Sequence, residues 1–427
     1  MQSSSDDQKP NNAGPGQDRR TFLKAGALAT GAMTLAGPLS ARSGAGRRGG
    51  TKVTVVLFQR GGADHLNLYA PTGDPFYAQL RPTIGVLPPG STGAVVGLPM
   101  STTFSMHPAM TGLHARFTAP NSRLGIVHAV GYLPYNRSHF ESQDLYETGL
   151  APGSPPDGWI NRHLQVTSTT QDPPVRALAL RPTLPLSMAG SYPCFTVATM
   201  QDLTFIGQAD MRVTLEAITD TTPTGAMHAQ QQLAYQSGID AFDLIDIFAG
   251  INPATYVPAN GAVYPVNAIG QALKEVAEVI KANLGVEFYA VDHNGWDHHA
   301  GLVTAINNTA TQLSQAINAF FTDLGTLGVD VVLVTMSEFG RIPAENGSGG
   351  TDHGVGGAML VAGGAVNGGL VHGIWPGLSQ QAMISGRFLA PSNDFRSVLR
   401  EILEVHMGGT DPNIVFPGHV HAPIGIL

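Results

Sequence analysis

The sequence has 427 residues, of which 43% are hydrophobic and only 13% are charged, and its formal net charge is -8. A chain of this length can bury a large core, either as one α/β domain or as two smaller domains. The negative charge, without a basic stripe after the first 50 residues, excludes nucleic acid as an expected partner.

Residues 1–50 are predicted to be a signal peptide and linker, and residues 51–427 a single folded domain. Arg19 and Arg20 precede a mildly apolar segment rich in Gly and Ala, 25–39. Paired arginines in this position are typical of twin-arginine export signals, and about 15 apolar residues are too few to span a bilayer. We therefore expect export by the twin-arginine translocon to the periplasm or the cell surface, with no transmembrane segment in the mature chain.

The first predicted strand, 52–58, is followed by a Gly-Gly turn and Asp64. Its continuous run of aliphatic and β-branched residues is typical of a strand buried on both faces of a parallel sheet. Ligands bind at the carboxyl ends of such strands, which makes Asp64 a candidate site residue. A lone Asp after a strand is also a common helix cap or turn former, so the sequence leaves both roles open.

A second predicted strand, 124–130, leads to the start of a helix at Ser138 and His139. Ser138 and Glu141, three residues apart, match a capping box. The N-terminus of a helix that follows a strand is also a place where anions bind, and Arg137, Ser138 and His139 would stand together there. The sequence does not decide between these two interpretations.

The densest group of metal-ligating side chains, Asp297, His298 and His299, follows a predicted strand at 286–291. The spacing of the apolar residues after this group predicts a long amphipathic helix over 302–324. The group therefore lies between a strand and a helix, where loops carry ligands in α/β proteins.

The chain is organised around a buried strand predicted at 329–336. Glu338 and Arg341 follow it, and a glycine-rich loop then carries Asp352 and His353. With the preceding strand and helix it forms a βαβ unit, whose crossover is expected to be right-handed. The carboxylates that follow these parallel strands should therefore lie at the same edge of the sheet. Glycine lets the loop fold closely around whatever its two ligating side chains hold.

Carboxylates and imidazoles are the ligands that hard and borderline cations prefer, and the single Cys194 excludes a cysteine-rich site. Two divalent ions could polarise an ester oxygen and activate a nucleophile or water. The residue types do not distinguish between zinc, manganese, magnesium and calcium. A structural hydrogen-bonded network is the alternative. The predicted metal ligands are Asp64, Asp297, His298, His299, Glu338, Asp352 and His353.

Five short motifs occur in a fixed order between about residue 53 and the C-terminus. They are Arg60–Asp64, Ser138–Phe140 with Thr148–Gly149, Gly295–Ala300, Ser337–Arg341 and Gly350–Gly354. Together they resemble the landmarks of the domain-of-unknown-function 1501 (DUF1501) family. That family is similar to the alkaline-phosphatase-like superfamily of sulfatases, phosphodiesterases and phosphomutases. The resemblance implies an α/β fold with a mostly parallel central sheet, helices on both faces and two metal ions at the carboxyl edge.

The resemblance also implies roles for individual residues. Asp64 matches the metal ligand after the first strand. Asp297 and His299 match the Asp-His pair of one metal, and His353 matches its late histidine. Glu338 falls where the superfamily has an Asp after a buried strand.

Two positions differ from the superfamily pattern. Phe339 stands where a histidine ligand normally follows the acid. Counting ten residues back from Gly149, the position expected for the nucleophile falls on His139 rather than on Ser138. Either Ser138 is the nucleophile, or His139 replaces the missing ligand and water attacks; we favour the ligand role for His139.

The sequence therefore predicts an exported metal-dependent hydrolase of a phosphate or sulfate ester. Its substrate would be a small anionic ester or a sulfated or phosphorylated glycan. The candidate catalytic residues are Ser138, His139 and Arg341, and Arg341 or Arg137 would clamp the anionic group, since a guanidinium binds it bidentately. The alternative, which Phe339 favours, is a non-catalytic metal- or glycan-binding surface protein on the same fold.

Overall fold

The computed structural model describes residues 51–427 except 151–156, 204–210, 215–237, 239 and 410. The predicted export signal lies outside the described residues. Within the described part of the chain, no helix combines the length and the apolar composition needed to cross a membrane.

The centre of the molecule is a nine-stranded sheet with the order β11-β5-β10-β9-β1-β8-β6-β7, in which β12 also pairs with β5. Its middle strand, β1 (Val53–Gln59), pairs in parallel with β8 (Phe288–His293) on one side and β9 (Val331–Met336) on the other. Of the described strands in this sheet, β10 alone runs against its neighbours. The other strands are β5 (Leu124–Gly131), β6 (Ala177–Leu180), β7 (Phe195–Val197), β10 (Gly357–Gly363), β11 (Val371–His372) and β12 (Asn393–Asp394). A smaller sheet joins β2 (Tyr69–Ala70), β3 (Leu98–Pro99) and β4 (Ser105–Met106).

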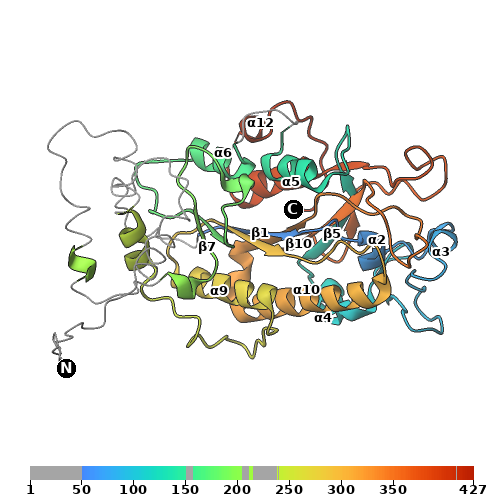
Figure 1. Ribbon diagram of the computed structural model, residues 1–427, viewed down its shortest axis with the longest axis horizontal. Coiled ribbons are helices and arrows are strands. Elements are labelled where there is room, and N and C mark those ends of the chain that lie inside the picture. The colour runs from blue at the N-terminus through green and yellow to red at the C-terminus, as the bar shows by residue number, and fades with distance from the viewer. Residues whose placement is uncertain (1–50, 151–156, 204–210, 215–237, 239, 410) are drawn as a thin grey trace, which may run out of the picture.

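Helices cover both faces of the main sheet (Figure 1). One layer contains α4 (Thr111–Phe117), α9 (Ala268–Ala282) and α10 (Leu302–Leu324), and the other contains α5 (His139–Thr148), α6 (Trp159–Val166), α11 (Phe395–Glu401) and α12 (Pro412–Val415). The short helices α2 (His65–Leu68) and α3 (Tyr77–Leu80) lie towards one end of the sheet (Figure 1). Short 3-10 segments lie at Pro108–Met110, Leu186–Met188, Met200–Asp202 and Gly325–Asp330, and a π-helical turn at Ile402–His406.

The core consists of two apolar layers that the sheet separates. Because successive side chains of a strand point to opposite faces, Val55 and Leu57 of β1 pack into the layer of α9 and α10. Val56 and Phe58 pack into the layer of α5, α6 and α11. All seven residues of β1 are buried, which explains why the strand sequence is continuously apolar rather than alternating.

The predicted fold class is confirmed: the protein is α/β, with a mostly parallel central sheet and helices on both faces. The helix predicted over 302–324 has these bounds in the structure. The strand predicted at 329–336 begins two residues later, because Val329 and Asp330 belong to the 3-10 segment that ends α10.

The sheet brings several loops to one edge. β1, β5, β8 and β9 all end there, and the antiparallel β10 begins there. In the parallel register Gln59 lies beside His293, and Phe58 lies beside Met336. The segments that follow these strands are therefore neighbours, as the sequence predicted.

Candidate metal centre

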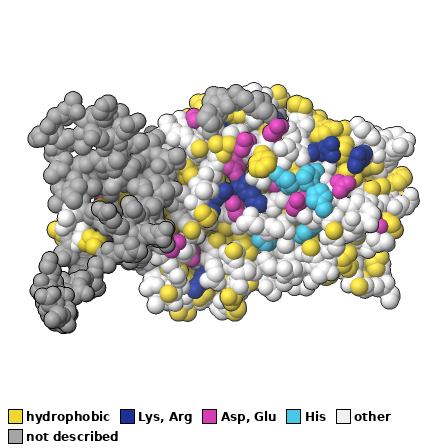
Figure 2. All heavy atoms as spheres, in the orientation of Figure 1, with side chains coloured by type: hydrophobic (Ala, Val, Ile, Leu, Met, Phe, Trp, Pro, Cys, Tyr) yellow, Lys and Arg dark blue, Asp and Glu magenta, His cyan; other side chains and the backbone are white. Residues whose placement is uncertain are grey.

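Four of the predicted site residues converge at this edge of the sheet. Asp297 and His299 lie in the loop after β8, His353 lies in the loop between β9 and β10, and His139 is the first residue of α5. One ligand atom from each of His139, Asp297 and His353 lies within 4.8 Å of the other two, so the three could hold a metal ion. Histidine side chains gather in one area of the face shown in Figure 2, with basic side chains on two sides of it.

The ligand atoms of His139, Asp297 and His353 form the group that could hold one ion, and His299 lies beside this group. Asp297 Oδ1 lies 3.0 Å from His299 Nε2 and 3.3 Å from His353 Nε2. Asp297 Oδ2 lies 3.7 Å from His139 Nε2, and the Nε2 atoms of His299 and His353 are 3.0 Å apart. Ligands bound tetrahedrally at 2.0–2.1 Å, as around zinc, are separated from one another by about 3.3 Å.

All three imidazoles present Nε2 to this centre because Nδ1 faces an acceptor. The Nδ1 atom of His139 lies 2.8 Å from Glu338 Oε1, that of His353 lies 3.0 Å from the Arg137 carbonyl oxygen, and that of His299 lies 3.4 Å from Asp352 Oδ1. In the tautomer with the proton on Nδ1, each of these acceptors takes a hydrogen bond and Nε2 presents a lone pair to the centre. Metal-binding histidines are oriented in this way.

Glu338 supports His139 rather than facing the open side of the cluster. Its carboxylate is fully buried, and Oε1 accepts hydrogen bonds from Gly61 N (2.9 Å) and Gln143 Nε2 (3.0 Å) as well as from His139. Burial alone would raise the pKa of Glu338. The hydrogen bonds from Gln143, the backbone and His139 outweigh burial and hold this pKa below its ordinary value. The group therefore remains a carboxylate that fixes the imidazole.

The structure places Asp64 at the predicted edge but does not bring it into the cluster. Its side chain is fully buried and forms an ion pair with the equally buried Arg81, at 2.7 Å from Oδ1 to Nη1. Oδ2 accepts from Thr351 Oγ1 at 2.9 Å, and Oδ1 accepts from Asn67 N at 3.1 Å as the N-cap of α2. Burial would raise the pKa of Asp64, but Arg81 and Thr351 hold it below its ordinary value. Both oxygens thus have protein partners.

Arg341 also points into the protein rather than towards a substrate. Its side chain is fully buried, and Nε donates to the Gly62 carbonyl oxygen at 2.6 Å while Nη1 donates to that of Thr351 at 3.0 Å. Nη2 donates to Asp297 Oδ1 at 2.6 Å. The Arg341 guanidinium therefore orients Asp297. Arg137, the other residue predicted to bind the anionic group, is exposed and lies beside the cluster.

The two remaining predicted ligands have different surroundings. The His298 side chain is buried, its ring centroid lies 6.1 Å from that of Trp296, and its ligand atoms are not among those that converge. Burial lowers the pKa of His298. Asp352 lies beside the cluster, where Oδ1 accepts from His299 Nδ1 and from Asn346 Nδ2 at 3.1 Å. Asp352 therefore supports His299 in the same way that Glu338 supports His139.

The start of α5 differs from the predicted capping box. Ser138 is the N-cap residue, but its side chain makes no capping hydrogen bond. Glu141 is hydrogen-bonded to Asn136 instead. Phe339, where a histidine was expected, is buried, and its ring centroid lies 4.9 Å from that of His139 and 4.6 Å from that of His353. The Phe339 ring therefore packs on two of the histidines and offers no ligand atom for a second metal ion.

The sequence analysis missed Gln143. This residue lies one helical turn after His139 on α5, donates to Glu338, and accepts from Arg60 Nη1 at 3.2 Å. Arg60 is in turn paired with Glu147 and Asp292. Residues four apart on a helix share a face, so the spacing from His139 was the signal that could have identified Gln143.

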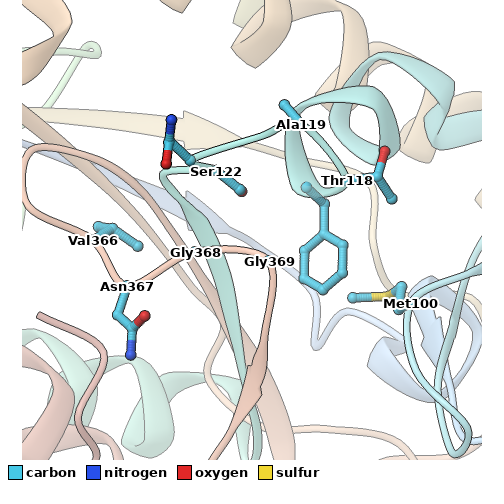
Figure 3. A pocket seen from close by; sticks show the side chains of 10 residues that line it. Met100, Thr118, Ala119, Ser122, Val366, Asn367, Gly368 and Gly369 are labelled. Carbon is cyan, nitrogen blue, oxygen red and sulfur yellow. The ribbon is translucent and has the colours of Figure 1, made fainter.

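The candidate metal centre lies at the surface, and one cavity of the protein lies elsewhere. That cavity, of about 510 Å³, opens between the end of α4 and the turn before β11 (Figure 3). Its lining carries no ionisable side chain: it consists of Met100, Phe117, Thr118, Ala119, Asn121, Ser122, Val366, Asn367, Gly368 and Gly369. It offers none of the chemistry expected of the site.

Comparison with known proteins identifies a family but no characterised relative. Residues 130–413 match the family described as "Protein of unknown function (DUF1501)". No curated protein matches the sequence. Among solved structures, the C-terminal periplasmic domain of EptC from Escherichia coli, in complex with Zn, resembles the chain at 10% sequence identity. The resemblance covers 77% of each chain with a TM-score of 0.30, a level that adds nothing to the argument about the site.

Proposed function

Since the chain belongs to the DUF1501 family of proteins of unknown function, we propose its function from the site itself: it is an exported hydrolase of an anionic ester that uses one divalent metal ion. The ligands would be His139, Asp297 and His353, with His299 beside them. The observation that carries this proposal is the pair of Nε2 atoms of His299 and His353, 3.0 Å apart with Nδ1 of each facing an acceptor. When Nδ1 carries the proton in both rings, both Nε2 atoms present lone pairs, and a cation near them would hold the two rings together.

We propose a single ion in place of the two that the resemblance implied. Asp64, which would hold the second ion, is neutralised by Arg81, and Glu338 is engaged by Gly61, Gln143 and His139. Phe339 supplies no ligand atom. Two imidazoles and one carboxylate favour zinc over the oxygen-preferring magnesium and calcium.

In this proposal, zinc would supply the Lewis acidity that polarises the ester and lowers the pKa of water. The protein supplies the geometry. Arg341 fixes Asp297, and Glu338 and Asp352 fix His139 and His299. With His139 as a ligand, water attacks the ester, and the Ser138 hydroxyl, free of a capping bond, lies next to the site without being required.

The second candidate is a metal- or glycan-binding surface protein without turnover. The shallow, open site and the Phe339 ring packed on two of the ligands favour it. Release of nitrophenol from p-nitrophenyl phosphate, bis(p-nitrophenyl) phosphate or p-nitrophenyl sulfate by the zinc-loaded protein would support the hydrolase. No release from any of them by protein that retains its zinc would favour the binding protein.

Elemental analysis tests the metal centre directly. We expect one zinc per chain in the purified protein and loss of that zinc in His139→Ala and His353→Ala. The control is His114→Ala, which removes a half-buried imidazole on α4 that is hydrogen-bonded to the Pro99 carbonyl oxygen. Zinc retained at the wild-type level in both ligand variants would contradict the proposed centre, and two zinc ions per chain would contradict the single-ion site.

Export by the twin-arginine route is also part of the proposal, and it rests on Arg19 and Arg20. Replacing both by lysine should leave the precursor in the cytoplasm, as fractionation would show. Normal export of the double variant would point to the general secretory route instead.

A further inference from the structure

Two exposed arginines lie on one aromatic ring beside the metal centre. The guanidinium carbon of Arg137 lies 4.8 Å from the centroid of the Phe388 ring, and that of Arg387 lies 5.5 Å from it. The main chain of Arg137 is tied to the cluster, because its carbonyl oxygen faces His353 Nδ1 at 3.0 Å. The charge of Arg387 acts on Asp352, the carboxylate that holds His299. Both guanidiniums therefore border the centre.

These two guanidiniums differ from most others in the described chain because no carboxylate pairs with them. The Arg137 guanidinium makes one long hydrogen bond, 3.4 Å from Nη1 to the His353 carbonyl oxygen. The Arg387 guanidinium makes no hydrogen bond or ion pair with the described residues, although its backbone N–H donates to the Ile384 carbonyl oxygen. Eight other described arginines are each paired with a carboxylate: Arg60, Arg81, Arg176, Arg181, Arg212, Arg341, Arg396 and Arg400.

The pairing matters because the protein as a whole is acidic, with a net charge of -8. Carboxylates are therefore available elsewhere in the protein, but none is paired with these two guanidiniums. Two guanidiniums that pack on the same ring repel each other when no negative charge lies near them. Exposure and the Phe388 face reduce this repulsion, but an anion between the guanidiniums would offset it most directly.

We propose that Arg137 and Arg387 form a clamp that makes the site specific for the dianionic phosphate of a phosphomonoester. This inference rests on the proposed hydrolase function. A phosphomonoester carries close to two negative charges at neutral pH, whereas a sulfate ester or a phosphodiester carries one. Two guanidiniums can bind the non-bridging oxygens bidentately while the ester oxygen faces the histidine cluster. Hydrolysis then adds water to phosphorus and releases the alcohol and inorganic phosphate.

The test uses a matched pair of ligands that the protein cannot hydrolyse. Phenylphosphonate is a dianion at mildly alkaline pH, and phenylsulfonate, of nearly the same shape, is a monoanion. Calorimetric titration of the zinc-loaded protein should show tighter binding of phenylphosphonate. In Arg137→Gln and Arg387→Gln its Kd should rise about tenfold each, the scale of one charge-assisted hydrogen-bonded contact at an exposed site. Phenylsulfonate binding should change less.

Controls separate this clamp from a general charge effect. Arg116→Gln removes a guanidinium that also lies over a ring, Phe321 at 5.8 Å, but on α4 and away from the cluster. Its ligand affinities should match the wild type. The double variant with lysine at 137 and 387 keeps the charge and loses the bidentate geometry, so it should recover only part of the affinity.

The outcomes also separate the clamp from the hydrolase proposal, because binding is measured without turnover and zinc is measured in every variant. A wild-type protein that binds both ligands equally, or binds neither, overturns the clamp even if it hydrolyses esters. A phosphonate preference that survives in both glutamine variants overturns it as well. The wild type could also fail to hydrolyse any ester while it still prefers phenylphosphonate and the glutamine variants lose that preference. This result overturns the hydrolase and leaves the clamp as a phosphate-binding site.

Discussion

Glu338 illustrates how much of the candidate centre depends on residues that do not touch the metal position. Its carboxylate makes the shortest contact with any of the three imidazoles, 2.8 Å to His139 Nδ1, and it does so from a fully buried position. Glu338→Gln keeps the shape and removes the charge that makes the imidazole a stronger ligand. We expect zinc affinity to fall by 10- to 100-fold, which is the usual cost of losing such a partner.

Competition with a chromogenic chelator measures that affinity. The matched control is Glu345→Gln, since Glu345 is half-buried and its carboxylate accepts hydrogen bonds from Thr83 and Ile84. It should leave zinc affinity unchanged. Equal affinity in the Glu338 variant and the wild type would show that this carboxylate has no influence on the metal.

Asp64 lies at the same edge of the sheet, but its side chain pairs with Arg81 instead of facing the candidate centre. Asp64→Asn would leave the buried charge of Arg81 without a partner, which typically costs about 3–5 kcal/mol of unfolding free energy. We expect that loss in a chemical denaturation experiment, with zinc content unchanged. Loss of zinc from a variant that is still folded would restore Asp64 as a ligand.

The same ion pair sets a pH dependence. Arg81 and Thr351 hold the pKa of Asp64 below its ordinary value of 3.8 in the folded protein, despite its burial. A depressed pKa in the folded state means that the stabilisation is complete above the unfolded pKa and is lost as the pH falls through the folded one. The free energy of unfolding of the wild type should therefore decrease below about pH 4, and this part of the decrease should be absent from Asp64→Asn.

At the scale of elements, the site depends on how closely the loop between β9 and β10 packs on the loop after β8. Gly350 is the point of contact: a Cβ added there would approach the main chain of His299 more closely than 3.0 Å, a separation that real Cβ atoms essentially never show. Gly350→Ala should therefore push the two loops apart and lower zinc affinity. In Gly347→Ala, on the same loop, the new Cβ meets nothing within 4 Å, and affinity should be unchanged.

Zinc titration of the two alanine variants measures this effect. Since tetrahedral zinc bonds tolerate errors of only about 0.2 Å, even a small displacement of His299 from His353 should be visible. Equal affinities in the two variants would mean that the loops move independently of the centre.

The elements that form this edge could be predicted because each has a strong local signal. The buried strands are continuous apolar runs, as in Val331–Met336, and the parallel topology then places the segments after them at the same edge. The direction of each polar side chain could not be predicted. Arg341 turns inward because carbonyl oxygens of Gly62 and Thr351 accept from it, and Asp64 pairs with Arg81 from a segment without regular pattern. Such partners are set by tertiary contacts that no local sequence pattern records.

At the scale of the whole molecule, the candidate centre joins three segments that are far apart in the chain: the start of α5, the loop after β8 and the loop before β10. An ion bound there crosslinks the folded sheet edge, and the unfolded chain cannot reproduce the site. Zinc should therefore stabilise the folded protein by mass action, by about 2.7 kcal/mol when free zinc is 100 times its Kd.

This linkage also counts the ions. Above saturation, each tenfold increase in free zinc should add about 1.4 kcal/mol to the free energy of unfolding if one ion binds, and about twice that if two bind independently. We expect the one-ion slope in the wild type, because Asp64 and Glu338 are occupied by protein partners. In His139→Ala, which removes a ligand, the zinc affinity should drop and the rise in the free energy of unfolding should begin only at higher zinc. A two-ion slope in the wild type would mean that Arg81 or Gln143 gives up its carboxylate when metal arrives, and a slope of zero would remove metal from the function altogether.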